Sequence, residues 1–293
     1  MNSRITLGVI GLTSEWFEDL EPRIRSNARL TVATMFEEPA ARKRLLSRQE
    51  RLKVTGAVQG MLRTPGLRAV ICCRLGWRGE HMVRQVLERG LPVYLAAGAV
   101  AELDGQVEQL LSQVEEAGGI VCPDLSWRYT PATLRLRELL ATRLGPCRTI
   151  DIEVPEMSPA WLRTACDWSL LVSGTRGDPK GHRAAGAVHL ELGKTDVRIS
   201  TVERPVDDEA QSPPRPVWRI ECERGRAVLT GETEITWQTE EDCHTEHLRD
   251  ERSRLDVNLD LFFRRVAGGL IPTPSLTDVG RTETLLRSIA AAS

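Results

Sequence analysis

The sequence predicts an α/β domain with a parallel sheet, followed by an α+β domain with an open, mostly antiparallel sheet. A chain of 293 residues has room for about two domains. Up to residue 122, short apolar runs alternate with helical segments, which is typical of βαβ units with helices on both faces of a parallel sheet. Later strands alternate polar and apolar residues, which indicates antiparallel pairing. We therefore expect domains at 1–122 and 123–293.

The strands expected in the first domain are short apolar runs, as buried parallel strands require. They cover residues 5–10, 30–35, 67–73, 92–96 and 119–122. Apolar periodicity and terminal glycines predict the intervening helices at residues 15–26, 39–47, 79–90 and 104–117. Strands that alternate with helices in this way are joined by right-handed crossovers.

The second domain is expected to begin with two helices that flank one strand, and to end with two further helices. The first part comprises a helix at 131–144, a strand at 148–154 and a helix at 160–172. An antiparallel meander is then expected from strands at 187–192, 197–202, 218–222, 226–229 and 234–237. Residues 207–216 are rich in Pro, Asp and Ser and predict a surface loop, and the closing helices are expected at 254–267 and 278–291.

Composition excludes several classes of function. The formal net charge of -2 gives no electrostatic reason to bind nucleic acid or an anionic membrane. No apolar run approaches the roughly 18 residues of a membrane helix. Seven scattered cysteines predict free thiols in a reducing compartment, so we expect a cytoplasmic protein. Lysine is scarce, occurring only at Lys43, Lys53, Lys180 and Lys194.

A series of motifs in a fixed order points to one family. They lie at residues 5–12, 68–73, 81–93, 128–131, 144–145, 221–229 and 272–286. Together they resemble the glucose-fructose oxidoreductase, inositol dehydrogenase and rhizopine-catabolism family (Gfo/Idh/MocA) over nearly the whole chain. The resemblance implies a Rossmann-type dinucleotide-binding domain, a substrate domain whose open sheet forms dimers, and an NAD(P)-dependent oxidoreductase reaction.

The dinucleotide fingerprint of this family is incomplete here. Gly11 matches its first glycine, but Thr13 and Trp16 stand where the second and third allow close approach of the pyrophosphate and tight helix packing. Glu15 lies in the same first turn, where its charge would compete with a pyrophosphate. We interpret this segment as a helix start with Thr13 or Ser14 as N-cap.

The family carries an acidic residue that binds the cofactor ribose at the end of the second strand. Phe36 occupies that position in this sequence. Glu37 is adjacent, and strand alternation predicts that it points to the other side, although it could replace the missing acid. The full set of positions at which the resemblance implies cofactor contact is Gly11, Leu12, Thr13, Ser14, Phe36, Glu37, Cys73 and Ala96.

The family's catalytic side chains are also replaced. Its Glu-Lys-Pro motif corresponds to residues 96–98, so Ala97 stands at the position of the lysine that moves the substrate hydroxyl proton. Its catalytic Asp and His correspond to Ala160 and Thr164, in the register set by Asp167 and Gly174. We therefore predict no catalytic residue at the positions that the family uses.

Two tryptophans and two charged residues are the candidates for the cleft that the family has between its domains. Seven tryptophans are present against two tyrosines, with Trp16, Trp77, Trp127 and Trp168 near predicted strand ends or the domain junction. They could cover an emptied cofactor groove or take part in ordinary core and interface packing; we favour the groove for Trp16 and core or interface packing for the others. The cleft candidates are Trp16, Trp127, Arg128 and Asp167.

Two cysteine-containing segments could carry other chemistry, namely metal binding or thiol reactivity. Cys243, His244 and His247 could ligate a metal if they lay on a helix, but a second ligand pair is absent and we favour a polar loop without metal. Cys72 and Cys73 end the third strand, where adjacent side chains point to opposite faces, so buried structural thiols are expected.

The residues therefore predict a family member that has kept the fold and lost NAD(P) binding and hydride transfer. It would be a binding or regulatory protein, or the non-catalytic partner of an active paralogue, with no cofactor. We expect a homo-oligomer or a complex with that paralogue through the C-terminal sheet, and a small-molecule ligand is conceivable. The alternative is an active NAD(P)-dependent oxidoreductase acting on a sugar or polyol through relocated catalytic residues.

Overall fold

The structure is a computed structural model that describes residues 4–38, 53–202 and 214–292. The chain forms two compact units, which are described separately. Unit 1 comprises Met1–Asp124 and Leu259–Gly280, and unit 2 comprises Leu125–Asn258 and Arg281–Ser293. Residues 259–280, which the sequence division placed in the second domain, thus belong to unit 1.

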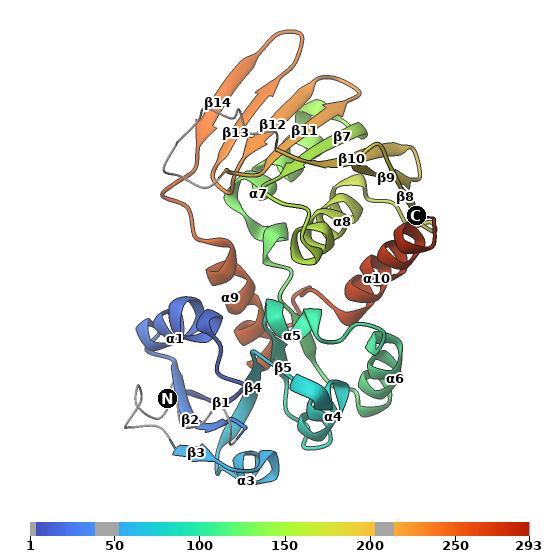
Figure 1. The fold of residues 1–293 in the computed structure, drawn as a ribbon. Helices are drawn as coiled ribbons and strands as arrows, with labels where there is room; N and C mark the ends of the chain where they lie inside the picture. The colour runs from blue at the N-terminus through green and yellow to red at the C-terminus, as the bar shows by residue number, and fades with distance from the viewer. Residues whose placement is uncertain (1–3, 39–52, 203–213, 293) are drawn as a thin grey trace. The chain divides into compact units, whose positions relative to one another are not determined.

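The sheet of unit 1 is six-stranded and parallel, in the order β3-β2-β1-β4-β5-β6 (Figure 1). Its strands are β1 (Ile5–Ile10), β2 (Leu30–Phe36), β3 (Lys53–Thr55), β4 (Leu67–Cys72), β5 (Val93–Leu95) and β6 (Val121–Pro123). The apolar runs of the central strands β1, β4 and β5 are almost wholly buried, which explains why they read as continuous hydrophobic segments. The parallel sheet expected from the sequence is confirmed.

Helices connect most of these strands. They are α1 (Glu21–Ser26), α3 (Val58–Leu62), α4 (Glu80–Leu87), α5 (Ala97–Ala101) and α6 (Val107–Ala117). A π-helical turn, Trp16–Leu20, precedes α1, so the helix expected at 15–26 is not one regular α-helix. The sequence analysis missed β3, α3 and α5, and its helix at 39–47 lies outside the described residues.

The sheet of unit 2 is eight-stranded, in the order β14-β13-β12-β11-β7-β10-β9-β8. Its strands are β7 (Cys147–Val154), β8 (Lys180–Ala184), β9 (Ala187–Leu192), β10 (Thr195–Thr201), β11 (Val217–Cys222), β12 (Arg226–Thr230), β13 (Glu234–Gln238) and β14 (Cys243–His247). The predicted simple meander is wrong in two respects: the edge strands β8 and β14 were not expected, and the strand order differs. Strands β10 and β11 are not neighbours, because β7 lies between them and pairs parallel with β10. The sheet is nevertheless mostly antiparallel, as expected.

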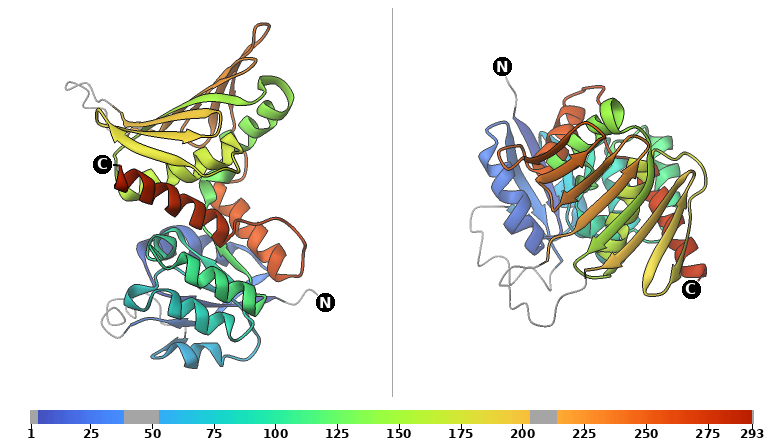
Figure 2. Two further views of the ribbon diagram at one scale, coloured as in Figure 1. Left: turned by 90° about the vertical axis from the view of Figure 1, so that its right-hand side faces the viewer. Right: turned by 90° about the horizontal axis from the view of Figure 1, so that it is seen from above.

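Helices cover one face of this second sheet, as Figures 1 and 2 show. They are α7 (Pro131–Leu139), α8 (Pro159–Ser173) and the C-terminal part of α10 (Leu276–Ala291). Helix α7 packs on β12 and β13, and α8 packs on β7 and β10. The other face is polar and open, because outward residues such as Arg198, Arg219 and Glu221 alternate with buried ones. The open sheet expected from the sequence is therefore confirmed.

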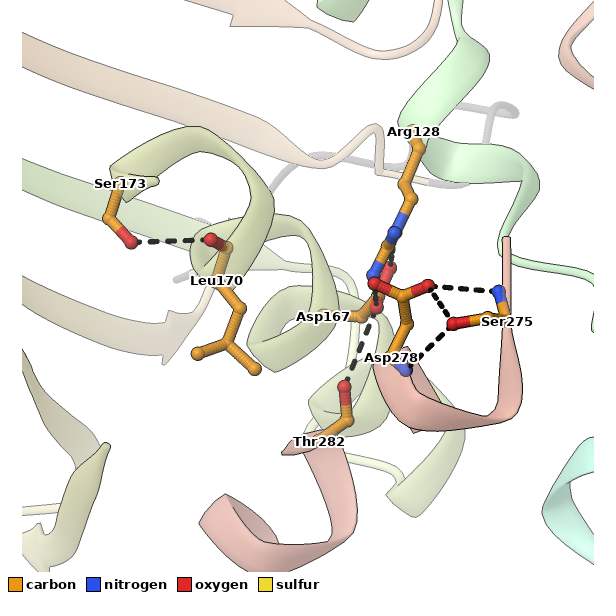
Figure 3. A network of polar contacts seen from close by, with 7 residues as sticks. All are labelled: Arg128, Asp167, Leu170, Ser173, Ser275, Asp278 and Thr282. Atoms are coloured by element: carbon orange, nitrogen blue, oxygen red, sulfur yellow. Dashed lines mark hydrogen bonds and ion pairs between the residues drawn. The ribbon is translucent and has the colours of Figure 1, made fainter. Parts of the chain in front are cut away.

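The remaining helical segments differ only at their ends from the expected ones. A π-helical turn, Leu140–Leu144, follows α7, and α9 covers Arg254–Val266. At the start of α10, Ser275 and Asp278 exchange hydrogen bonds that cap the helix (Figure 3). The loop expected at 207–216 lies mostly outside the described residues, as 203–213 are not described. Within the described ranges, no helix is long and apolar enough to span a bilayer.

Candidate functional site

The turn after β1 is built around a glycine that no other residue could replace without strain. Gly11 has a φ of +72° and donates its N–H to the Phe36 carbonyl at 3.1 Å. A Cβ added to Gly11 would lie 2.7 Å from the carbonyl oxygen of Arg74. The positive φ and this close approach therefore both require glycine at the first fingerprint position.

The carboxylate of Glu37 is bound to this turn, contrary to the prediction that it points away. Its Oε2 accepts the N–H of Leu12 at 2.5 Å, and its Oε1 accepts from Nη2 of Arg74 at 2.6 Å and from its neighbour's N–H, that of Glu38, at 2.9 Å. Glu37 is 1% exposed. Strand alternation failed as a guide because β2 ends at Phe36, one residue earlier.

Phe36 and Trp16, which replace residues of the cofactor site, both belong to the core of unit 1. Phe36 is 3% exposed, with the guanidinium of Arg78 5.9 Å from its ring centroid. Trp16 is fully buried, and its indole nitrogen has no hydrogen-bond partner. Thr13 accepts the N–H of Trp16 at 3.4 Å, which is the N-cap contact expected of Thr13 or Ser14.

A second carboxylate binds the loop after β4. Glu102 accepts the backbone N–H groups of Leu75 at 2.5 Å and of Gly76 at 2.9 Å through one oxygen. Trp77 follows in this loop and is 82% exposed, so it does not pack in the core of this chain, and packing at an interface stays a prediction. The guanidinium of the neighbouring Arg78 lies 5.2 Å from the centroid of the Trp77 indole, which is a cation–π contact that an exposed ring can make.

A third carboxylate binds the backbone after β5, where the family has its catalytic lysine. Glu15 accepts the N–H groups of Ala97 at 3.2 Å and of Gly98 at 3.5 Å, at the start of α5. Burial raises the pKa of Glu15, and the nearby carboxylate of Asp124 raises it further, while the two backbone hydrogen bonds oppose both effects. Ala97 thus stands at the position of the family's lysine, and its backbone N–H donates to the carboxylate of Glu15.

These three contacts share one location, the carboxyl ends of β1, β4 and β5. In open α/β sheets, ligands bind at this edge, and phosphate groups use free backbone N–H groups there. In this chain, Glu37, Glu102 and Glu15 accept such N–H groups themselves. The N–H groups of Leu12, Leu75, Gly76, Ala97 and Gly98 are therefore already bound by carboxylates, and this arrangement does not fit a dinucleotide pyrophosphate.

Two further positions compared with the cofactor site, Cys73 and Ala96, are closed to solvent, whereas Ser14 is exposed and Thr13 is half-buried. Cys73 and Ala96 are both 0% exposed. Cys72 is equally buried, and burial raises the pKa of both adjacent thiols well above the ordinary value. The prediction of buried thiols at Cys72 and Cys73 is therefore confirmed.

In unit 2, Arg128 and Asp167 form a buried, bidentate ion pair (Figure 3). Nε and Nη2 of Arg128 donate to the two carboxylate oxygens of Asp167 at 2.9 and 2.6 Å. Thr282 adds a hydroxyl contact to Asp167 at 3.5 Å from helix α10. The two side chains that the sequence analysis took as cleft candidates thus neutralise each other in the interior of unit 2.

The positions compared with the family's catalytic Asp and His lie on α8, in the turns before Asp167. Ala160 is exposed, and Thr164 is half-buried. Neither side chain can carry or remove a proton near neutral pH, so helix α8 offers no acid or base at these positions.

Four tryptophans gather in the core of unit 2. Trp168 stacks on Trp218 with ring centroids 4.9 Å apart, and its Nε1 donates to Thr133 at 2.9 Å. Trp127 contacts Trp218 and Trp161 at centroid distances of 5.5 and 5.2 Å. This cluster explains Trp127 and Trp168 as ordinary aromatic packing within unit 2.

The segment from Cys243 to His247 is the edge strand β14, so the expectation of a loop is wrong. A strand sends His244 and His247 to opposite faces. His244 stacks on Trp237 at 4.7 Å, whereas His247 lies 3.4 Å from Glu234. Among the described residues, no group of three metal-ligating side chains is present.

The sequence analysis recognised Glu15 as a competitor for phosphate but overlooked Glu102 and Arg74. Glu102 comes 26 residues after the N–H group that it binds at Gly76, and Arg74 comes 37 residues after Glu37. No local motif connects such residues. Glu102 directly follows the short helix α5, which was not predicted, so its acidic side chain near the predicted strand at 92–96 was the one available signal.

Comparison with known proteins shows which fold this is. No known family model matches the sequence, and no curated protein matches it. The structure is similar to a dehydrogenase from Chromobacterium violaceum, with a TM-score of 0.78 and 13% identity over 99% of this chain and 96% of that one. It is also similar to a UDP-N-acetylglucosamine 3-dehydrogenase from Acidithiobacillus ferrooxidans, with a TM-score of 0.76 and 16% identity over 99% of both chains.

A third similar structure is a 3-ketoreductase from Actinomadura kijaniata solved in complex with NADP. Its TM-score is 0.76, with 14% identity over 99% of this chain and 98% of that one. The chain therefore has the two-part fold of these oxidoreductases over its whole length. The resemblance to the Gfo/Idh/MocA family that the sequence motifs indicated is confirmed for the fold.

Proposed function

We propose that this chain is a member of the Gfo/Idh/MocA family that has lost dinucleotide binding and hydride transfer. The observation that carries this proposal is the set of three carboxylates, Glu15, Glu37 and Glu102, on the backbone N–H groups at the carboxyl edge of the parallel sheet. A bound cofactor would have to place its phosphates against the same edge.

Electrostatics makes it unfavourable for the phosphates of a cofactor to replace these carboxylates. Each hydrogen bond to a charged group contributes roughly 1.5–3 kcal/mol, and a pyrophosphate would have to displace such bonds while facing the same negative charges. An ionised carboxylate has about four acceptor positions, and Glu37 already uses three of them for Leu12, Glu38 and Arg74. Glu37 is also too deeply buried to receive a ribose hydroxyl.

The absence of acid and base side chains at the family positions supports the loss of the reaction. Positions 97, 160 and 164 hold Ala97, Ala160 and Thr164. General acid and base catalysis contributes a factor of about 100 to 10,000. Without the lysine and histidine, the hydroxyl proton that accompanies hydride transfer has no carrier at these positions.

The remaining role is that of a cytoplasmic binding or regulatory protein, or of a non-catalytic partner for an active paralogue. We propose the open face of the unit 2 sheet as the surface for a second copy or for that paralogue. This face bears cross-strand ion pairs, Arg219 with Glu153 at 2.7 Å and Arg198 with Asp151 at 3.8 Å. Such a surface favours a polar, charge-matched interface. Light scattering at low and high salt tests it, because screening should weaken an association of this kind.

Cofactor titration tests the proposed loss directly. We expect no heat of binding and no shift of the melting temperature with millimolar NAD(H) or NADP(H). A ligand at about 1,000 times its dissociation constant stabilises a protein by about 4.1 kcal/mol, so micromolar affinity would be obvious. The 3-ketoreductase from Actinomadura kijaniata, solved with NADP, is the positive control. Micromolar binding by this chain would contradict the proposal.

One observation favours the alternative, an active NAD(P)-dependent oxidoreductase on a sugar or polyol. Glu37 lies beside the Gly11–Leu12 turn at the end of β2, close to where the family's ribose-binding acid belongs. If this alternative holds, the native chain binds NAD(P) and Glu37→Gln weakens that binding at least tenfold. The control is Glu18→Gln in the π-helical turn Trp16–Leu20, where the side chain of Glu18 is exposed. This substitution should then leave the affinity unchanged.

A further inference from the structure

We propose that Cys147 and Cys222 are a reversible redox pair that small peroxides convert to a disulfide between β7 and β11. The two residues are direct partners in the antiparallel register of these strands. Among the described strands, no other register pairs two cysteines. This site belongs to unit 2 and is independent of the proposed loss of cofactor binding.

A β-bulge brings the two thiols to the same face. Glu221 pairs with Thr149, but the next residue, Cys222, pairs with Cys147, so Arg148 is the extra residue. Arg148 and Thr149 are both exposed, whereas Cys147 is buried. Without the bulge, alternation would place Cys147 on the open face, away from Cys222. The bulge therefore re-aims one side chain, which is a known effect of this irregularity.

Both thiols lie on the helix-covered face and belong to the core of unit 2. The S–H of Cys147 points to the Val172 carbonyl at 4.0 Å. The interaction between the two thiols lowers the pKa of Cys147 and raises the pKa of Cys222. We therefore assign Cys147 as the attacking thiol, because the thiolate is the reactive form. Each residue is 8% exposed, which leaves access for an oxidant as small as hydrogen peroxide.

The backbone around the pair is held on both sides. The N–H of Cys222 donates to the Gly225 carbonyl at 2.8 Å, and that of Glu223 donates to the Pro146 carbonyl at 3.1 Å. Thr195 donates its hydroxyl to the Cys147 carbonyl at 3.1 Å. Direct partners in a regular antiparallel ladder have Cα atoms about 4.5–5.5 Å apart, within the separation of about 4.4–6.8 Å that a disulfide accepts. The register that pairs Cys147 with Cys222 is therefore compatible with a disulfide bond.

The chemistry balances in two steps. The Cys147 thiolate attacks one peroxide oxygen, and the O–O bond breaks to give a sulfenic acid and, with a proton, one water molecule. The Cys222 sulfur then attacks the sulfenic sulfur, the S–O bond breaks, and a second water molecule leaves with the thiol proton. Two thiols have lost two electrons, and hydrogen peroxide has been reduced to two waters. A dithiol reductant reverses the bond by exchange.

Peptide mapping of peroxide-treated native protein tests the pair. Tryptic peptides 144–148 and 220–224 each contain one of the two cysteines, so the disulfide appears as their cross-linked product. We expect this product after peroxide treatment, its loss with dithiothreitol, and an intact mass lower by two hydrogen atoms. The oxidised protein should also melt at a higher temperature, because the bond constrains the unfolded chain.

Three variants sharpen the test. Cys147→Ser and Cys222→Ser should each abolish the cross-linked peptide, and Cys243→Ser, which removes an exposed thiol, should leave it unchanged. Native protein that keeps both peptides reduced would overturn the proposal. So would oxidation confined to peptide 69–74, which carries Cys72 and Cys73, or to Cys243.

Discussion

Two buried carboxylates, Glu37 in unit 1 and Asp167 in unit 2, each form an ion pair with an arginine, but the surroundings of the two pairs differ. Asp167 lies on a helix, at a position where the family resemblance implies a structural acid. It pairs with Arg128, and both partners are buried. Glu37 stands next to the position of a ligand-binding acid, yet its carboxylate binds the chain's own turn and the partly exposed Arg74. The first ion pair lies in the interior of unit 2, and the second lies at the edge where we propose that a ligand site has been lost. A buried ion pair alone therefore does not distinguish structure from function.

The largest expected effect comes from breaking the pair in unit 2. Asp167→Ala removes the two carboxylate acceptors that the buried Arg128 guanidinium uses, and we expect a loss of about 3–5 kcal/mol in the free energy of unfolding. Urea denaturation measures it, with Asp167→Asn as a milder variant that keeps one acceptor. The matched control is Arg198→Ala, which breaks a half-exposed pair with Asp151 and should cost less than about 1 kcal/mol. Equal effects at both sites would contradict this assignment.

A smaller loss is expected from the pair in unit 1. Glu37→Ala removes an acceptor from the Leu12 N–H, but Arg74 is 37% exposed and can turn towards water. We expect a loss of about 1–3 kcal/mol in the free energy of unfolding, the cost of one unsatisfied buried donor. Glu18→Ala, at an exposed position nearby, should change stability by less than about 0.5 kcal/mol. A loss for Glu37→Ala as large as that for Asp167→Ala would remove the distinction between the two pairs.

The smallest effect concerns the pH dependence of unit 1. The pKa of Glu15 is raised above 4.5 in the folded chain, so the folded state binds this proton more tightly than the unfolded state. The contribution of Glu15 to stability is present below the pKa that it has in the unfolded chain. This contribution is lost as the pH rises through the raised pKa of the folded chain. Glu15→Gln should flatten that part of the melting-temperature profile while keeping an acceptor for Ala97 and Gly98. An unchanged profile would show that Glu15 titrates normally.

The fold was largely predictable because its signals are local. The apolar run of β1 and the alternation of β9 predicted both strands at their observed ends. Strand β14 was missed because, as an edge strand with exposed polar residues, it has no hydrophobic alternation. The position of β7 between β10 and β11 was also missed, since strand order depends on pairing between distant segments.

The candidate site was only half predictable, for a related reason. The identities of Ala97, Ala160 and Thr164 are sequence facts, and given the family resemblance they already argue against its reaction. The orientation of Glu37 was predicted wrongly, because alternation applies inside a strand and this residue follows the strand's last residue. What a side chain does beyond the end of an element depends on the loops it meets there.

The sequence by itself determined the two-part fold, the glycine of the first turn and the absence of acids and bases at the family's catalytic positions. These follow from local periodicity, backbone sterics and residue identity. Only the tertiary structure decided that three glutamates bind the edge of the parallel sheet, and that a bulge sets Cys147 against Cys222. Hydrogen bonds and thiol contacts depend on distances of a few ångströms between residues far apart in the chain, and folding alone sets those distances.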